Sequence, residues 1–387
     1  MKLIAIHFAR LGPYHVARMR SAVDALGPMG WRVLALETAG NDATYAWDRE
    51  SAGVGWDRET VFPDRVFEMI PASEMRRGME AALNRLRPQA LAIAGWGTVD
   101  ARACLSWCQK NSATAIVMSE TRAVDGRRVW WREWVKSRIV RRFDAAMCGG
   151  LSHKRYLMQL GIPAERIVFG YNVVENDYYA PRLESTVAGP YFLASNRFVE
   201  RKNLARLIQA YALYAASAPA GEGAGVWPLV LLGDGPLRPT LEALAGELEM
   251  ARGNSDSIEG RRQAASGHVV FAGFRQIQEL PGFYANAGAF VHPALEEPWG
   301  LVINEAMASG LPVLSSRNVG AAEELVVEGK TGFFFDPENP EEIAACLAKL
   351  AGMTPEARFA MGRAARNMVE EKVPLQAFGE GLAKLLA

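Results

Sequence analysis

The chain has 387 residues, half of them hydrophobic, and its 43 lysines and arginines balance 43 aspartates and glutamates. This length exceeds what one hydrophobic core usually supports, so we expect two domains. A net charge of zero argues against nucleic acid as the main partner, and no apolar run is long enough to span a membrane.

Cysteine usage and the N-terminus indicate the cellular compartment. Four cysteines in a chain of this size make no disulfide framework. Cys104 and Cys108 lie one helical turn apart without other ligands nearby, so we interpret them as small buried hydrophobes and not as metal ligands. The first residues resemble a short buried strand more than a signal peptide, and we expect a cytoplasmic protein.

Short apolar runs alternate with helical patterns along the chain, which is typical of parallel sheets with helices on both faces. In the first half, strands are expected at residues 3–8, 33–36, 90–94, 115–119, 145–148 and 167–169. Gly12 and Pro13 follow the first strand and open a helix. His15 is then either a helix-start residue or a residue that faces a ligand.

Residues 127–142 hold seven basic residues and one acid, with Trp130, Trp131 and Trp134 among them. An amphipathic helix at a membrane interface has this composition. The alternative, which we favour slightly, is that the tryptophans pack on the sheet and the charges are solvated. Peripheral contact with the inner face of a membrane therefore stays open as a prediction.

The pattern breaks between Asn172 and Pro190, where we expect an interdomain linker. In the second half, strands are expected at residues 191–194, 229–232, 269–271, 289–292, 313–315 and 333–335. Residues 253–267 are polar and rich in turn residues, as in a surface insertion. Asn203 is expected to cap the helix that follows it.

Two cations occupy the loop after the first strand of the second half. Arg197 and Lys202 stand where a strand leads into a helix, so both can converge on a bound anion. Arg201 is expected to be an ordinary solvated residue. After the next strand, Gly233 belongs to a tight turn that does not complete a dinucleotide-binding motif.

The segment from Glu297 to Glu305 is the most informative part of the chain. Its layout predicts a strand, a turn through Trp299 and Gly300, a short helix, and the next strand after Pro312. Glu297 is then in a loop at the carboxyl end of a strand, where α/β sheets bind ligands. A carboxylate can accept two hydrogen bonds from a diol, so the two acids suit a ribose or a sugar. His292, just before, is expected to be a hydrogen-bonded strand-end residue and not a catalyst.

This block of seventeen residues, from Glu297 to Val313, resembles the signature of retaining glycosyltransferases of family 4. The resemblance implies the GT-B fold: two tandem Rossmann-like, doubly wound parallel-sheet domains with an interdomain cleft. Residues 1–175 would bind the acceptor and residues 190–373 the nucleotide-sugar donor. A last helix at 374–387 would pack back on the first domain.

The resemblance also implies roles for residues of the second domain. Arg197 and Lys202 would bind the donor diphosphate in place of a metal ion. Glu305 would hold the ribose and Glu297 a hydroxyl of the transferred sugar. The amides of Trp299, Gly300, Leu301 and Val302 would meet the distal phosphate and sugar, and Gly233, Phe274 and Arg275 would line the donor pocket near the base. For Phe274, a core role and a base-stacking role are both open, and Asn318 to Glu323 either face the ligand or cap a helix.

In the first domain the resemblance is looser. Gly12 and His15 would lie near the donor phosphate and the acceptor. Many relatives have a histidine in the loop after the strand at 115–119, but this chain has Glu120. Glu120 would bind a sugar hydroxyl or an amine of the acceptor, or pair with Arg122.

The sequence and the resemblance therefore predict a retaining glycosyltransferase that moves a hexosyl unit from a UDP- or GDP-linked sugar to a hydroxyl acceptor, in bacterial polysaccharide, glycolipid or glycoconjugate biosynthesis. The acceptor is a glycan, a lipid-linked molecule or a small molecule. No Asp-x-Asp or His/Cys cluster offers a metal site, so no cofactor or metal is expected. The alternatives are a sugar-nucleotide epimerase or hydrolase of the same fold, and a non-catalytic partner in a glycan-assembly complex.

Overall fold

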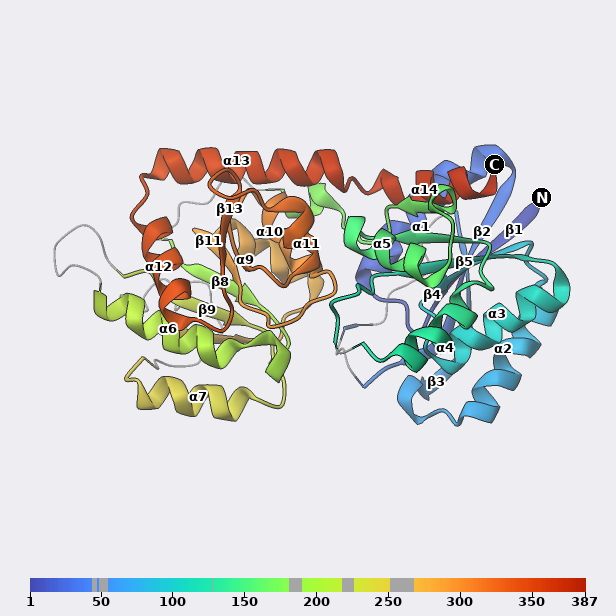
Figure 1. Ribbon diagram of the computed structural model, residues 1–387, viewed down its shortest axis with the longest axis horizontal. Helices are drawn as coiled ribbons and strands as arrows, with labels where there is room; N and C mark the ends of the chain where they lie inside the picture. Colours follow the sequence, from blue (N-terminus) through green and yellow to red (C-terminus); the bar gives the residue numbers. More distant parts are fainter. Residues whose placement is uncertain (44–46, 49–54, 127, 181–189, 218–225, 251–267) are drawn as a thin grey trace. The chain divides into compact units, whose positions relative to one another are not determined.

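The computed structural model describes residues 1–43, 47–48, 55–126, 128–180, 190–217, 226–250 and 268–387 (Figure 1). The chain divides into two compact units: Met1–Glu175 together with Val373–Ala387, and Asn176–Lys372. The expected insertion at 253–267 lies outside the described residues, as do residues 181–189 of the expected linker. Among the described residues, no helix has both the length and the apolar character that crossing a membrane requires.

The first unit contains a seven-stranded sheet in which every neighbouring pair is parallel and the order is β3-β2-β1-β4-β5-β6-β7. The strands are β1 (Lys2–Phe8), β2 (Trp31–Asn41), β3 (Asp57–Val66), β4 (Ala90–Ala94), β5 (Thr114–Ser119), β6 (Ala145–Cys148) and β7 (Ile167–Phe169). The helices are α1 (Pro13–Leu26), α2 (Ala72–Leu86), α3 (Val99–Asn111), α4 (Trp130–Val140), α5 (Leu151–Leu160) and α14 (Gln376–Leu386). Every strand except β3 follows from the apolar runs, because a strand covered on both faces carries apolar side chains at successive positions.

The edge strand β3 is not predicted by those runs. Its sequence is mostly polar, includes Pro63, and is only partly buried. What holds it is the fully buried Glu37 of β2, whose Oε2 accepts from Arg58 Nε at 3.0 Å and from Thr60 Oγ1 at 2.7 Å. An edge strand of this kind is fixed by polar contacts that a hydrophobic pattern does not reveal.

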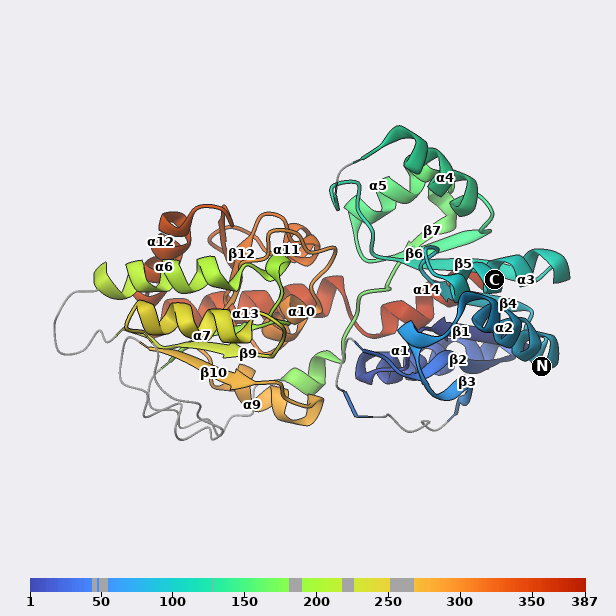
Figure 2. The ribbon, with the colours of Figure 1, turned by 90° about the horizontal axis from the view of Figure 1, so that it is seen from below.

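The second unit contains a six-stranded parallel sheet in the order β10-β9-β8-β11-β12-β13 (Figure 2). The strands are β8 (Phe192–Ser195), β9 (Leu229–Leu232), β10 (Val269–Gly273), β11 (Ala289–His292), β12 (Val313–Ser316) and β13 (Gly332–Phe335). The helices are α6 (Leu204–Ser217), α7 (Arg238–Glu247), α9 (Leu280–Ala285), α10 (Leu301–Ala308), α11 (Gly320–Leu325), α12 (Pro340–Ala351) and α13 (Pro355–Lys372). Counted along the unit, this is the 3-2-1-4-5-6 order of a Rossmann fold, and ligands bind where that order reverses.

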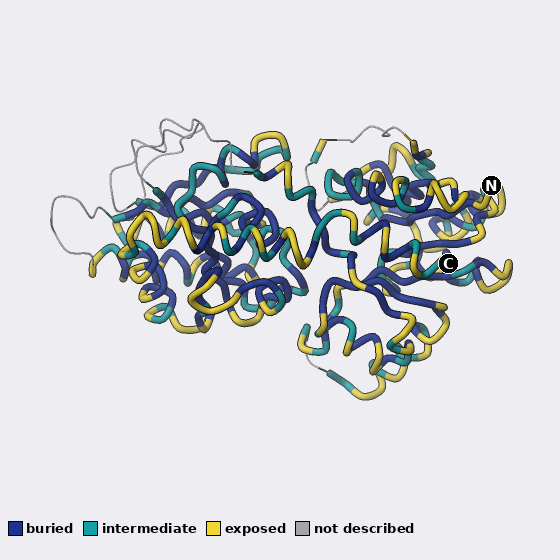
Figure 3. Tube along the Cα trace, turned by 90° about the horizontal axis from the view of Figure 1, so that it is seen from above, coloured by how far each residue is buried: buried dark blue, intermediate teal, exposed yellow. Residues whose placement is uncertain are grey.

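Each sheet lies in a separate apolar core, and apart from the edge strand β3 the strands are mostly buried (Figure 3). In the first unit, α14 packs closely on α1. A Cβ at Gly379 would overlap the carbonyl oxygen of Ser21, and the Gly379 N–H donates to Ser21 Oγ at 2.9 Å. Glycine is therefore required at this helix crossing, since any side chain would separate the two helices.

The prediction that Asn203 caps the next helix through its side chain is wrong. Asn203 has a φ of 58°, and its Nδ2 donates to the carbonyls of Pro293 and Pro337, at 3.1 and 2.7 Å. Its Oδ1 accepts from Arg206 and not from a helix N–H. Asn203 thus joins the start of α6 to loops of the same unit.

Candidate functional site

Two loops of the second unit meet at the carboxyl ends of β8 and β11, the neighbouring strands at which the strand order reverses. Lys202 lies in the first loop and donates from Nζ to Oε2 of Glu297 in the second. The backbone joins the same loops, because the Leu295 N–H donates to the Arg201 carbonyl at 2.9 Å. The candidate site is therefore at the position where such sheets bind ligands.

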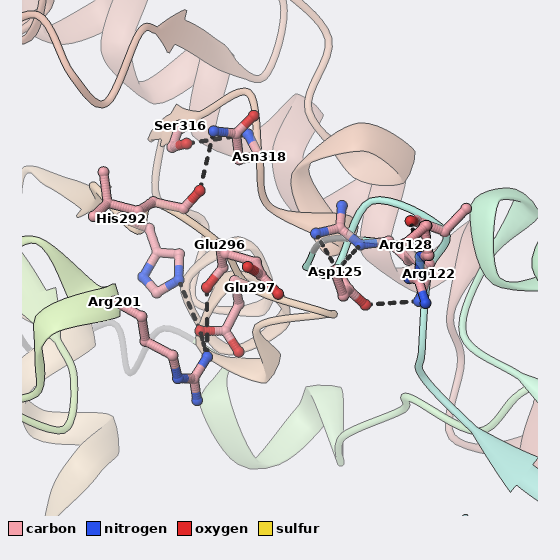
Figure 4. Close-up of polar contacts among 11 residues, drawn as sticks. Arg122, Asp125, Arg128, Arg201, His292, Glu296, Glu297, Ser316 and Asn318 are labelled. Atoms are coloured by element: carbon pink, nitrogen blue, oxygen red, sulfur yellow. Dashed lines mark hydrogen bonds and ion pairs between the residues drawn. The ribbon is translucent and has the colours of Figure 1, made fainter. Parts of the chain in front are cut away.

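Glu297 is the centre of this cluster (Figure 4). Its side chain is nearly buried, and Oε2 also accepts from Arg201 Nη1 at 3.1 Å. Burial alone would raise the pKa of this carboxyl, but the Lys202 ammonium that donates to Oε2 holds the pKa below its usual range. Glu297 is therefore ionised at neutral pH.

The two other basic residues of the first loop, Arg197 and Arg201, differ in their contacts. Arg201 was predicted to be an ordinary solvated residue. Half of its side chain is exposed, but its guanidinium also pairs with Glu297, which was not predicted. Arg197 is exposed, and its side chain has no ion-pair partner among the residues that the structure describes. Of the two predicted diphosphate ligands, Lys202 is thus held by an acid, whereas Arg197 remains available to an anion.

His292 is fully buried at the end of β11, and the expectation that its hydrogen bonds are satisfied is wrong. Neither ring nitrogen has a hydrogen-bond partner among the described residues. Its Nε2 lies 3.8 Å from Glu297 Oε2, which is too long for a hydrogen bond. Burial lowers the pKa of His292, so the imidazole is neutral at pH 7.

Glu305 lies on α10 and is fully buried. The hydroxyl of Tyr284, on α9, donates to Glu305 Oε2 at 2.5 Å. Tyr284 is itself fully buried, and its ring meets those of Tyr179 and Phe290 at 5.7 and 5.8 Å between centroids. Glu305 is therefore positioned by a tyrosine that the motif does not contain.

The turn before α10 is packed. Trp299 is 1% exposed, and its indole Nε1 donates to Asn304 Oδ1 at 2.9 Å. Gly300 has a φ of 96°, and a Cβ there would lie 3.2 Å from Glu297 Cγ. Leu301 and Val302 begin α10, whose first N–H groups have no partner inside the helix. A helix N-terminus thus lies directly beside Glu297.

The remaining predicted donor residues surround the ends of β9 and β10. Gly233 has a φ of 126°, and a Cβ there would overlap the Asn196 carbonyl oxygen, so the tight turn requires glycine. Phe274 is partly buried, which leaves both of its proposed roles open. Arg275 donates to the Ala272 carbonyl at 3.1 Å.

Asn318 does not cap the helix that follows it, because α11 begins after Val319 without a side-chain cap. Its Nδ2 donates to the Leu295 carbonyl at 3.0 Å, and its own carbonyl accepts from the Glu297 N–H at 3.3 Å. The loops after β11 and β12 are held together through this residue (Figure 4).

In the first unit, His15 is a helix-start residue. Its Nδ1 accepts from the Gly12 N–H at 2.9 Å, and its ring stacks on Phe8 at 4.0 Å. Burial and the nearby Arg18 lower the pKa of His15 from 6.5 to about 3.

The lowered pKa of His15 predicts that the folded protein loses stability in acid. Between pH 6.5 and about 3 the unfolded chain binds a proton at His15 that the folded chain does not. Stability therefore falls as the pH is lowered through this window. The difference in the free energy of unfolding between pH 7 and pH 5, measured with denaturant, should be smaller for His15→Gln than for the unchanged protein. An identical pH dependence in both would contradict the assignment.

Glu120 and Arg122 each contact a further side chain, and the pairing of the two with each other stays a prediction. Asn172 Nδ2 donates to Glu120 Oε2 at 2.8 Å, whereas Arg122 is buried and binds Asp125 through Nε at 3.0 Å (Figure 4). The exposed position of Glu120 leaves an acceptor role open.

The favoured prediction that the tryptophans of residues 127–142 pack on the sheet is wrong. Trp130, Trp131 and Trp134 are 82%, 50% and 55% exposed. The helix instead buries Val140 completely. Residue 127 lies outside the described part of the chain.

The structure thus assembles Lys202, Glu297 and the start of α10 in the second unit, and places Gly12, His15 and Glu120 in the first. Composition and spacing give no signal for the contacts of Tyr284 and Asn318, because each reaches the site from a different loop or helix. Among the described residues no group of three or more His, Cys, Asp or Glu side chains could hold a metal ion. All four cysteines are buried free thiols, and burial raises the pKa of Cys108 to about 12.

The sequence matches a family model and several known proteins, all of them glycosyl transferases. Residues 181–368 match the family model of glycosyl transferases group 1. A GDP-mannose-dependent alpha-(1-6)-phosphatidylinositol monomannoside mannosyltransferase of Mycolicibacterium smegmatis is 30% identical over 205 residues, which are 51% of this chain and 48% of that protein. A sulfoquinovosyl transferase of Arabidopsis thaliana is 34% identical over 148 residues, 37% of this chain and 24% of that protein. The chain therefore spans less than half the length of these relatives.

Solved structures resemble the whole chain. A sucrose-phosphate synthase from Thermosynechococcus elongatus superposes with a TM-score of 0.71 at 18% identity, covering 100% of this chain and 98% of that one. The structure of HepE of Anabaena in complex with UDP and glucose superposes with a TM-score of 0.72 at 16% identity. The match covers 100% of this chain and 99% of that one. At such low identity these likenesses show the fold, and the predicted GT-B fold class of two Rossmann-like parallel-sheet domains is confirmed.

Proposed function

From a second unit that matches the family model of glycosyl transferases group 1, we propose that this chain is a retaining glycosyltransferase of family 4. It transfers a hexosyl unit from a UDP- or GDP-linked sugar to a hydroxyl of a glycan, a lipid-linked molecule or a small molecule. The observation that carries the proposal is the Lys202–Glu297 pair beside the start of α10, at the reversal of strand order.

Departure of the nucleoside diphosphate is the demanding step, because negative charge grows on the leaving phosphate. Lys202, the exposed Arg197 and the N–H groups that begin α10 supply positive potential for this charge. An ammonium has three N–H donors, so Lys202 is suited to hold Glu297 and a phosphate oxygen together. The bond from the anomeric carbon to the phosphate oxygen breaks.

The acceptor oxygen bonds to the same face of the anomeric carbon, and its proton passes to the leaving phosphate. No carboxylate is clearly placed to act as a nucleophile at the anomeric carbon. This favours same-face attack by the acceptor over a covalent glycosyl-enzyme intermediate. Glu297 binds a hydroxyl of the transferred sugar, and Glu305 binds the ribose. The Tyr284 hydroxyl donates to Oε2 of Glu305 and so positions the carboxylate for the ribose.

The test incubates the purified chain with a panel of nucleotide sugars, with and without mixtures of acceptors, and follows products by mass spectrometry. A glycosylated product with the donor's anomeric configuration supports the proposal. Nucleotide release that does not depend on acceptor would indicate a hydrolase, and an isomerised sugar an epimerase. No turnover of any donor would favour a non-catalytic partner of a glycan-assembly complex.

Chelation gives a second expected result. Activity should be unchanged in excess chelator, because two cations and a helix N-terminus take the role that Mg²⁺ has at other diphosphate sites. Rates are measured with the best donor before and after treatment with EDTA. Activity that disappears with EDTA and returns with added Mg²⁺ or Mn²⁺ would contradict this prediction.

A further inference from the structure

One face of α4 is exposed and apolar. We call it the α4 outer face, and its members follow one side of the helix at positions i, i+1, i+4 and i+5. They are Trp130, Trp131, Trp134 and Val135, at 82%, 50%, 55% and 42% exposure. Isolated exposed apolar residues are ordinary, but three tryptophans on one helical face are not.

The opposite side of α4 is fixed to its own unit. Tyr156 of the neighbouring α5 donates to Glu133 Oε2 at 2.7 Å, and Lys136 donates to Glu133 Oε1 at 2.8 Å. The Arg128 guanidinium lies 4.5 Å from the Tyr156 ring. Figure 2 shows α4 and α5 side by side. The tryptophans therefore face outward because the inner side of the helix is already engaged.

The α4 outer face also carries positive charge. The guanidinium of Arg138 lies 4.4 Å from the Trp134 ring, and that of Arg132 lies 5.2 Å from the Trp131 ring. Arg141 and Arg142, which follow the helix, are exposed. The acid within α4, Glu133, belongs to the inner network. Because the whole chain has no net charge, this positive potential is local.

This mixture of residues favours a lipid surface over a protein partner. Tryptophan and arginine are frequent at protein interfaces too, but the α4 outer face carries arginines without an acid, which suits an extended anionic surface. A second copy of the chain, related by a two-fold axis, would place this positive patch against an identical positive patch. At a bilayer surface, indole rings lie at the level of the headgroups and arginines meet the phosphates.

We propose that the α4 outer face binds the surface of an anionic lipid bilayer, with its tryptophans in the interface and its arginines at the lipid phosphates. The helix lies along the surface and does not enter the hydrocarbon core. This interaction does not depend on the glycosyltransferase reaction, so its test needs no donor or acceptor.

The experiment measures partition of the full chain between buffer and vesicles by sedimentation. Vesicles of phosphatidylcholine are compared with vesicles that also contain phosphatidylglycerol, at low and at high salt. Binding should require the anionic lipid and weaken with salt. Three of the ten tryptophans are exposed, so their fluorescence should shift to shorter wavelength on binding.

Two variants separate the two contributions. Arg132→Gln with Arg138→Gln should lower the partition coefficient roughly tenfold or more, since each basic residue near the surface contributes about fivefold. Trp130→Ala with Trp131→Ala and Trp134→Ala should abolish the fluorescence shift. The matched control is Phe359→Ala with Arg363→Gln on α13, where an exposed phenylalanine has a guanidinium 4.5 Å from its ring. This control should bind as the unchanged chain does.

All of the substituted side chains are exposed, so the variants should unfold at the same denaturant concentration as the unchanged chain. The proposal is overturned if the unchanged chain does not bind anionic vesicles, or if it binds neutral vesicles equally well. It is also overturned if both α4 variants bind normally. Self-association without vesicles that the α4 variants abolish would identify a second copy as the occupant instead.

Discussion

Replacing Lys202 by alanine is expected to lower turnover by on the order of 10²–10³, the usual cost of losing one group that stabilises charge in the transition state. Lys202 is nearly buried, and its ammonium holds Glu297 in the same site. Its loss also leaves a buried carboxylate with less compensation, so the free energy of unfolding should fall by about 1–3 kcal/mol. Initial rates at saturating donor and denaturant unfolding measure the two effects separately.

Two neighbouring arginines serve as controls for this variant. Arg197→Ala should also reduce turnover strongly but leave stability unchanged, because the Arg197 side chain is exposed and has no ion-pair partner among the described residues. Arg201→Ala removes a half-exposed cation that pairs with the same Glu297 oxygen, and it should affect turnover least. Near-normal rates for both Lys202→Ala and Arg197→Ala would refute the diphosphate assignment. A loss in Arg201→Ala as large as that in Lys202→Ala would show that the ion pair itself, and not Lys202, is required.

Substituting the two acids of the motif, Glu297 and Glu305, should impair different steps. Glu305→Ala should weaken binding of the free nucleoside diphosphate by about 1–3 kcal/mol, because the ribose is present in donor and product alike. That loss corresponds to roughly 5- to 150-fold in affinity. Glu297→Ala should bind the free nucleoside diphosphate almost normally, since this ligand lacks the sugar, but should turn over the intact donor slowly.

Calorimetry with UDP and GDP, beside kinetics with the sugar nucleotides, distinguishes these outcomes. Tyr284→Phe is the matched control for Glu305, because it removes the hydroxyl that donates to Glu305 Oε2 and keeps the ring. We expect an affinity between that of Glu305→Ala and that of the unchanged chain. If Glu297→Ala loses as much nucleotide affinity as Glu305→Ala, the proposed division of roles is wrong even if the transferase reaction is found.

The sequence predicts well what depends on local pattern. All six strands of the second unit follow from apolar runs, and β9 and β11 have the predicted bounds, because strands buried on both faces require continuous apolar sequence. The Glu297–Glu305 spacing likewise predicts a strand, a turn and the helix α10, since glycine permits the left-handed backbone at Gly300.

Polar contacts between distant segments could not be predicted in the same way. Nothing near Glu305 in the sequence indicates that Tyr284 covers its carboxylate, and nothing near Glu297 indicates that Lys202 and Arg201 share one of its oxygens. Such pairs depend on which strands are neighbours and on where each loop ends. The motif identifies the acids but not their environment.

The sequence alone determined the fold class and the segment that forms the candidate site, because hydrophobic periodicity and glycine placement act over a few residues. Tertiary structure decided the rest. It buried Trp299, which had looked like part of a ligand loop, and it exposed the tryptophans of α4, which had looked like core residues. Whether an aromatic side chain is buried depends on what packs against its helix or turn, and those neighbours come from parts of the chain that no local pattern specifies.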